Sequence, residues 1–110
     1  MLPKKIALLV KEAAIDKKAE DPVILDLGKL TSVARYFAVM HGNSDRHVRA
    51  VAENIIDVLE AKGIKAWHKE GLDHGQWVLL DYGAVIVHVF HRDMRDFYGL
   101  ERLWGEAARL

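Results

Sequence analysis

One stretch constrains the fold of this chain more than any other. Residues 77–91, WVLLDYGAVIVHVFH, are almost continuously apolar, and Gly83 can supply the positive φ of a tight turn. Residues 77–82 and 84–91 are therefore predicted to pair as an antiparallel hairpin. Because side chains alternate along a strand, the first strand has two faces: Trp77, Leu79 and Asp81 on one, and Val78, Leu80 and Tyr82 on the other. Both faces are largely apolar, so the hairpin is either covered by helices on both sides or presents one face to a partner.

The rest of the chain supplies elements for such a hairpin to pack against. Apolar residues spaced by three and four predict one helix that begins near Pro3, and a second that Ser44 caps and Gly63 ends. Short apolar runs predict three more strands, at residues 23–27, 36–41 and 64–70. Residues 92–110 are predicted to close the chain as helical turns, with a break at Gly99.

The predicted element order is α-β-β-α-β-β-β-α, in a single domain of residues 1–110. The long helix between the second and third strands implies a parallel, right-handed crossover, whereas the hairpin is antiparallel. The expected fold is therefore of the α/β class, with a mixed five-stranded sheet flanked by helices.

Composition limits the classes of function. Sixteen basic and sixteen acidic residues cancel, so the basic surface that drives nucleic-acid binding is not expected. No apolar run reaches the roughly 18–20 residues of a membrane span, and the N-terminal segment resembles neither a signal peptide nor a transit peptide. The expected location is the cytoplasm, and no membrane partner is predicted.

The side chains predict no catalytic site, no metal site and no cofactor. The chain has no cysteine, and its two serines lie outside known nucleophile motifs. His88 and His91 differ by three positions, so they point to opposite faces of a strand and cannot share a metal ion.

One junction leaves an alternative open. Gly42 and Ser44 lie between a strand and a helix, where free N–H groups can hold an anion. Nucleotidyltransferases use a similar turn, together with a pair of aspartates that bind metal. Here Asp45 and Asp81 are isolated carboxylates, so a degenerate nucleotide-binding protein is the second hypothesis.

The residues also leave open that one face of the hairpin binds another protein. Trp, Tyr and Arg are enriched where binding energy concentrates, and Trp77 begins its strand directly after a glycine-containing loop. Trp77 is therefore the residue of the hairpin most expected at the surface. An apolar face of this kind could also form a homodimer.

Three segments together resemble a known family: YFAVMHGNSDRHVRAVAENI, EGLDHGQWVLLDYGAVIVHVFH and MRDFYGLERLWG. Their order and spacing resemble those of the same segments in the ribosomal silencing factors (RsfS), also called Iojap-related proteins. The resemblance implies a nucleotidyltransferase-like fold without catalysis. It further implies binding to the large ribosomal subunit at its fourteenth ribosomal protein, which blocks joining of the small subunit and represses translation when nutrients are scarce.

The resemblance also carries over individual positions. The residues expected to contact the partner are Trp77, Leu79, Asp81, Tyr82, Arg95 and Tyr98. The residues that match the family's helix-start junction are Gly42, Ser44 and Arg49. The chain departs from the family at Arg35 and Arg92, where aspartate and proline are frequent. After Arg92, Asp93 is expected to cap the following helix.

Overall fold

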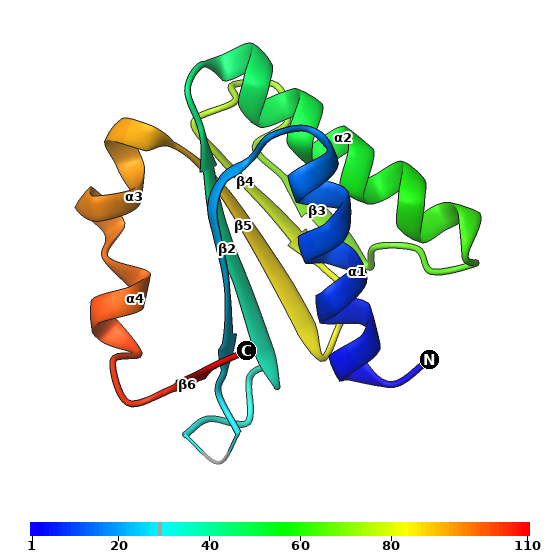
Figure 1. The fold of residues 1–110 in the computed structure, drawn as a ribbon, viewed down its shortest axis with the longest axis vertical. Coiled ribbons are helices and arrows are strands. Elements are labelled where there is room, and N and C mark those ends of the chain that lie inside the picture. The colour runs from blue at the N-terminus through cyan, green and yellow to red at the C-terminus, as the bar shows by residue number, and fades with distance from the viewer. Residues whose placement is uncertain (29) are drawn as a thin grey trace.

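The computed structural model describes residues 1–28 and 30–110. Figure 1 shows the sheet with the longer helices on one side and the short helices on the other. The helices are α1 (Pro3–Asp16), α2 (Asp45–Ala61), α3 (Arg92–Tyr98) and α4 (Leu100–Leu103). The strands are β1 (Glu20–Asp26), β2 (Tyr36–Gly42), β3 (His68–Glu70), β4 (Trp77–Asp81), β5 (Val85–His91) and β6 (Ala108–Arg109).

The sheet has the strand order β3-β4-β5-β2-β1-β6. β2 and β5 pair in parallel at its centre, while the other neighbouring strands pair antiparallel. The predicted class, a mixed α/β sheet flanked by helices, is confirmed. The predicted number of five strands is wrong, because β6 pairs with Leu25 and Asp26 of β1. Two residues are too few to show a strand period, so this segment reads as part of the helical turns.

The predicted hairpin is confirmed as β4 and β5. Gly83 has a φ of 82°, and its N–H donates to Oδ1 of Asp81 at 2.7 Å. The third strand is shorter than predicted and starts at His68, although the N–H of Trp67 still donates to the carbonyl oxygen of Asp81 at 2.8 Å. β3 is an exposed edge strand, so only its few ladder contacts define it.

The ends of the helices follow from local hydrogen bonds. Oγ of Ser44 accepts the N–H of His47 at 3.1 Å, which confirms the predicted cap of α2. The sequence predicts that Asp93 caps α3, and this prediction is wrong. His91 does so instead, because its Nδ1 accepts the N–H of Asp93 at 3.3 Å. Gly99, with a φ of 60°, separates α3 from α4 as predicted.

Strand alternation divides the apolar side chains between two cores. The core under α1 and α2 takes residues of the strands and of the hairpin turn from one side of the sheet: Ile24, Tyr36, Ala38, Met40, Val78, Leu80, Tyr82, Val85, Val87 and Val89. The core on the opposite face contains Leu25, Leu27, Ala34, Phe37, Val39 and Phe90. The segment from α3 to β6 covers this second core with Met94, Leu100, Trp104 and Ala107. The two faces are therefore covered unequally.

Candidate functional site

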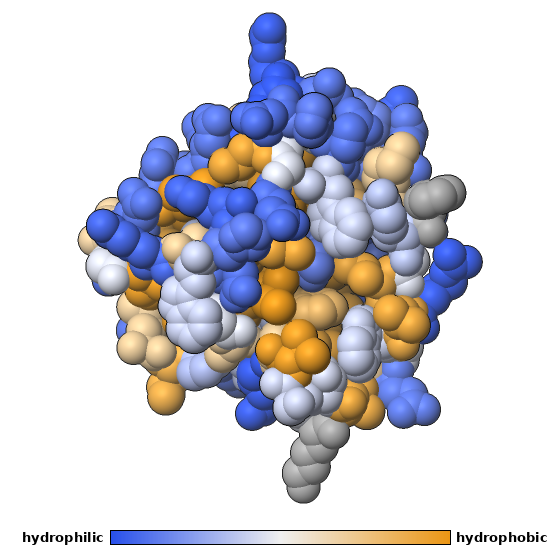
Figure 2. Space-filling view, turned by 180° about the vertical axis from the view of Figure 1, so that it is seen from behind, coloured by the Kyte–Doolittle hydropathy of each residue, from blue (hydrophilic) through white to orange (hydrophobic). Residues whose placement is uncertain are grey.

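Part of the second face lies beyond the cover of α3 and α4. We define this open face by four side chains that are neither fully buried nor fully exposed: Trp77, Leu79 and Asp81 of β4, and Ile86 of β5. Figure 2 views the molecule from behind, opposite to α1, and shows hydrophobic residues reaching the surface in the middle of this side. The hairpin thus has one covered face and one partly open face.

Trp77 is half-buried and held in an aromatic cluster. Its ring centroid lies 5.1 Å from that of Phe90 and 4.3 Å from that of Tyr98. Its Nε1–H donates to Nδ1 of His88 at 3.2 Å. Tyr98 belongs to α3 and is 44% exposed, so the cluster extends the open face from the sheet onto that helix. The prediction of Trp77 near the surface agrees with this placement.

Hydrophilic side chains border the open face on the side of β3. Leu79 lies opposite Glu70 and Asp81 lies opposite His68 in the β3–β4 ladder. Nε2 of His68 and Oε1 of Glu70 are 2.8 Å apart. The predicted contact residue Asp81 accepts the N–H of Gly83, so its main structural role is to hold the turn.

Tyr82 does not lie on the open face. It shares the strand face of Val78 and Leu80 and is only 6% exposed in the core under α1 and α2. Burial raises the pKa of its hydroxyl to about 12. Tyr82 is predicted as a contact residue, but in the free chain it lies on the face that α1 and α2 cover.

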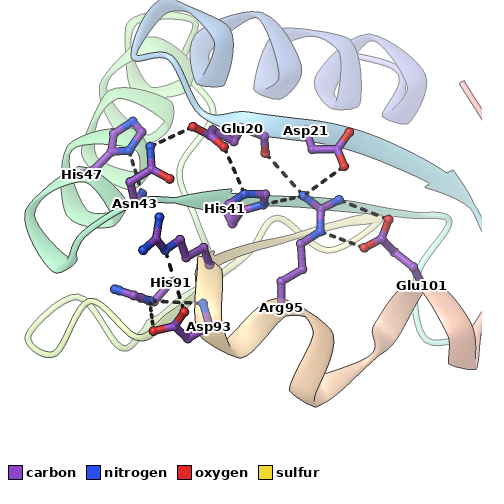
Figure 3. Close-up of polar contacts among 10 residues, drawn as sticks. Glu20, Asp21, His41, Asn43, His47, His91, Asp93, Arg95 and Glu101 are labelled. Carbon is purple, nitrogen blue, oxygen red and sulfur yellow. Dashed lines mark hydrogen bonds and ion pairs between the residues drawn. The ribbon is translucent and has the colours of Figure 1, made fainter.

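Arg95, another predicted contact residue, is also buried. Its Nε and Nη2 donate to the two carboxylate oxygens of Glu101 at 2.8 and 3.1 Å, and its Nη1 lies 2.9 Å from Nδ1 of His41. The same Nη1 lies 3.4 Å from the carbonyl oxygen of Glu20 and 4.0 Å from Oδ2 of Asp21 (Figure 3). The hydrogen bond and charge of Arg95 lower the pKa of Glu101. Arg95 therefore ties α3 to α4, β1 and β2.

The helix-start junction joins structural elements rather than presenting free groups. Gly42 is buried, and a Cβ there would lie 3.0 Å from the backbone nitrogen of Val48. The ring of His47 accepts the N–H of Asn43 at Nδ1, 3.0 Å away, so its Nε2–H donates to the carbonyl oxygen of Lys17 at 2.8 Å. Ser44 is occupied as the cap.

The same junction positions the start of β4. Gln76, which precedes Trp77, donates its side-chain amide to Oδ1 of Asp45 at 2.9 Å. A Cβ on Gly75 would meet Nη1 of Arg49 at 3.1 Å, so the half-buried Arg49 packs against this loop. The sequence places the junction and Trp77 in separate motifs, and the structure brings the loop just before Trp77 against the junction.

The structure also explains one departure from the family pattern. Nε of Arg35 lies 3.0 Å from Oδ1 of Asp26 on the adjacent strand, and this hydrogen bond lowers the pKa of Asp26. Arg92 is exposed and lies 3.8 Å from Asp93. Within residues 1–28 and 30–110, no group of three or more His, Cys, Asp or Glu side chains could hold a metal ion.

Two functional candidates, Ile86 and His88, were not predicted from the residues alone. Ile86 lies on the open face because β5 pairs with β4 so that Asp81 and Ile86 are opposite each other. The strand period does place Ile86 and His88 on one face, but it does not show which face the helices cover. None of the helices that the structure describes is long and apolar enough to cross a membrane.

Comparisons with known proteins agree over nearly the whole chain. The family model described as "Ribosomal silencing factor during starvation" matches residues 2–110. The chain is 47% identical over 107 residues to the ribosomal silencing factor RsfS of Bacillus subtilis, covering 97% of this chain and 91% of that protein. A crystal structure of a Chromobacterium violaceum protein matches with a TM-score of 0.93 at 40% identity, covering 96% of this chain and 88% of that one. A crystal structure of a Bacillus halodurans protein matches with a TM-score of 0.86 at 37% identity, covering 97% of both chains.

Proposed function

The chain belongs to the ribosomal silencing factor (RsfS) family, and from that premise we propose that it binds the large ribosomal subunit at the fourteenth large-subunit ribosomal protein. Bound there, it blocks joining of the small subunit by steric exclusion and represses translation when nutrients are limiting. It acts as a regulatory protein without catalysis, in the cytoplasm.

The open face is the observation that carries this proposal. Trp77, Leu79 and Ile86 remain partly exposed although they belong to β4 and β5, which both have a neighbouring strand on each side. A half-buried tryptophan on a partly exposed apolar face is the kind of anchor that dominates protein interfaces. The carboxylates of Asp81 on the open face and of Glu70 at its border would complement a basic ribosomal protein.

Co-sedimentation with purified large ribosomal subunits tests the proposal. The chain is expected to pellet with large subunits and to reduce the yield of joined ribosomes when small subunits are added. Trp77→Ala is expected to weaken binding by more than ~1 kcal/mol, the scale of an interface anchor. Absence of the wild-type chain from the pellet would contradict the proposal.

Trp67→Ala is the matched control for Trp77→Ala. Trp67 is 80% exposed and lies over Gly83 in the hairpin turn, outside the open face. The same chemical change at this position should leave binding unaltered. Equal losses for the two variants would place the interface at the turn instead of the open face. Thermal unfolding of each variant separates loss of contact from loss of fold.

The remaining hypotheses give different results in the same experiments. Saturable binding of nucleotide with magnesium would favour the nucleotidyltransferase-like alternative, which the occupied polar groups of Ser44 and His47 do not favour. A homodimer through the open face would compete with the ribosome. In that case Leu79→Asp would lower the sedimentation coefficient of the free chain.

A further inference from the structure

His88 lies directly behind the open face and contacts Trp77 through one defined hydrogen bond. The indole N–H can only donate, so Nδ1 of His88, 3.2 Å from Nε1 of Trp77, must accept. The proton of a neutral imidazole then resides on Nε2. This contact fixes both the tautomer of His88 and the side of the Trp77 ring that faces inward.

Nδ1 of His88 can accept a hydrogen bond throughout the physiological pH range. Its side chain is 4% exposed, and burial lowers its pKa to about 4. A protonated imidazole has no free acceptor, so protonation would break the bond to Trp77. Near neutral pH the ring is neutral and the bond persists.

The ring of His88 is itself held in place by its neighbours. Its centroid lies 4.7 Å from that of Phe37 in an edge-to-face contact, and it is nearly parallel to the ring of Phe90, at 9° and 6.1 Å. Trp77, in contrast, is only half-buried, so packing surrounds it on part of its surface. A fixed acceptor behind a partly free ring is an arrangement that can orient the ring.

Burial alone gives no reason for a histidine at this position. Nε2 of His88 has no hydrogen-bond partner among the residues that the structure describes. A buried N–H without an acceptor disfavours folding, and an aliphatic side chain would avoid that cost. The ring nitrogen that does have a hydrogen-bond partner is Nδ1, which accepts the indole N–H of Trp77.

We propose that His88 is a positioning residue for Trp77, whose Nδ1 holds the indole N–H and fixes the orientation in which Trp77 meets its partner. The inference rests on the proposed function, because it takes Trp77 as the contact residue. Orientation before binding lowers the entropy lost on association, so His88 strengthens binding without touching the partner.

The hydrogen bond can be tested in the free protein. In ¹⁵N-labelled wild type, a scalar coupling is expected between Nε1 of Trp77 and Nδ1 of His88, with His88 in the Nε2–H tautomer. Trp77→Phe assigns the indole signal. A wild-type spectrum without this coupling would overturn the inference, whatever the variants of His88 do to folding.

Binding to large ribosomal subunits tests the consequence. His88→Leu removes the acceptor and is expected to weaken binding roughly threefold to tenfold, the range of one net hydrogen bond. His88→Asn is the matched control, because its Oδ1 occupies nearly the place of Nδ1 and should keep affinity within about twofold. Equal affinities for the two variants would contradict the inference.

A double substitution separates positioning from general support of the fold. In a Trp77→Phe background no indole N–H remains, so adding His88→Leu should cause no further loss of binding. A further loss of the same size would show that His88 acts through the fold. If Trp77→Ala binds like wild type, the proposed function and the inference both fail. If Trp77→Ala weakens binding and His88→Leu does not, the inference alone fails.

Discussion

At the scale of single residues, Arg95 is a buried cation whose hydrogen bonds and ion pairs lie within the fold. Its partners come from β1, β2 and α4, and its side chain is 6% exposed. Arg95→Met should lower the free energy of unfolding by about 2–4 kcal/mol, since it leaves the carboxylate of Glu101 without its principal partner. Denaturant unfolding measures the loss.

Arg92→Met provides the comparison on the same helix. Arg92 is exposed, and its contact with Asp93 is a 3.8 Å surface ion pair. Such pairs contribute little, so this variant should change the free energy of unfolding by less than ~0.5 kcal/mol. Similar losses for the two arginine variants would mean that the buried network does not stabilise the fold.

His88 also makes a pH-dependent contribution to stability. In the unfolded chain its pKa returns to about 6.5, whereas burial lowers the folded pKa to about 4. Between these values the unfolded state binds more protons, so the contribution is complete above pH 6.5 and is lost as the pH falls toward 4. We expect a loss of roughly 2–3 kcal/mol over this window.

His88→Asn isolates this contribution from the carboxylates, which titrate in the same acidic range. Unfolding free energies of the wild type and the variant should converge or cross as the pH falls from 7 to 4. A constant difference between the two proteins would show that His88 does not titrate with a lowered pKa.

Residue-level prediction from the sequence succeeds where one-dimensional patterns suffice. Strand alternation correctly groups the partly exposed Trp77 and Leu79 and separates both from the buried Tyr82. Alternation does not tell which of the two faces the long helices cover, and this is why the burial of Tyr82 is not predicted. Arg95 and Glu101 are six positions apart across the break at Gly99, so helical spacing gives no hint of their pairing.

At the scale of elements, Gly71 positions the start of β4. It has a φ of 84°, and a Cβ there would clash with the carbonyl oxygen of Trp77. Gly71→Ala should therefore lower the free energy of unfolding for two reasons. Overpacking should cost about 1–3 kcal/mol, and the left-handed conformation of the alanine adds a further loss. It should also displace the backbone at Trp77, with a measurable loss of binding to large subunits.

Gly63→Ala is the control for conformation alone. Gly63 has a φ of 78°, but a Cβ there would meet nothing within 4 Å. This variant should cost about 1–2 kcal/mol and leave binding unchanged. Equal costs in thermal unfolding for the two glycine variants would argue against the close contact at Gly71.

The elements themselves differ in how far the sequence predicts them. α2 and the β4–β5 hairpin are predicted well, because each combines a strong apolar period with a cap or a turn residue such as Ser44 or Gly83. β3 and β6 are predicted poorly. Each is a short edge strand that depends on pairing with a distant neighbour, and such pairing leaves no local pattern.

At the scale of the whole molecule, the absence of net charge predicts how binding responds to salt. Sixteen basic residues balance sixteen acidic ones. A complex made through the apolar open face should lose less than about tenfold in affinity between 50 and 200 mM salt, whereas several phosphate contacts would cost about 1,000-fold or more. Co-sedimentation at several salt concentrations measures how the affinity depends on salt. A steep decline in affinity would indicate that the chain binds ribosomal RNA directly.

The parallel pairing of β2 with β5 has a consequence for how the chain reaches its fold. Tyr36 lies opposite Val85 in this central ladder, so the middle of the sheet joins residues 49 positions apart. Closing so long a loop is slow compared with forming a helix or a hairpin. During synthesis, the apolar strand β2 cannot pair with β5 until β5 has left the ribosome. Until then one edge of β2 is unpaired and can associate with other nascent chains. Fragments that stop before Val85 should therefore aggregate, whereas the full chain protects this strand at the centre of its sheet.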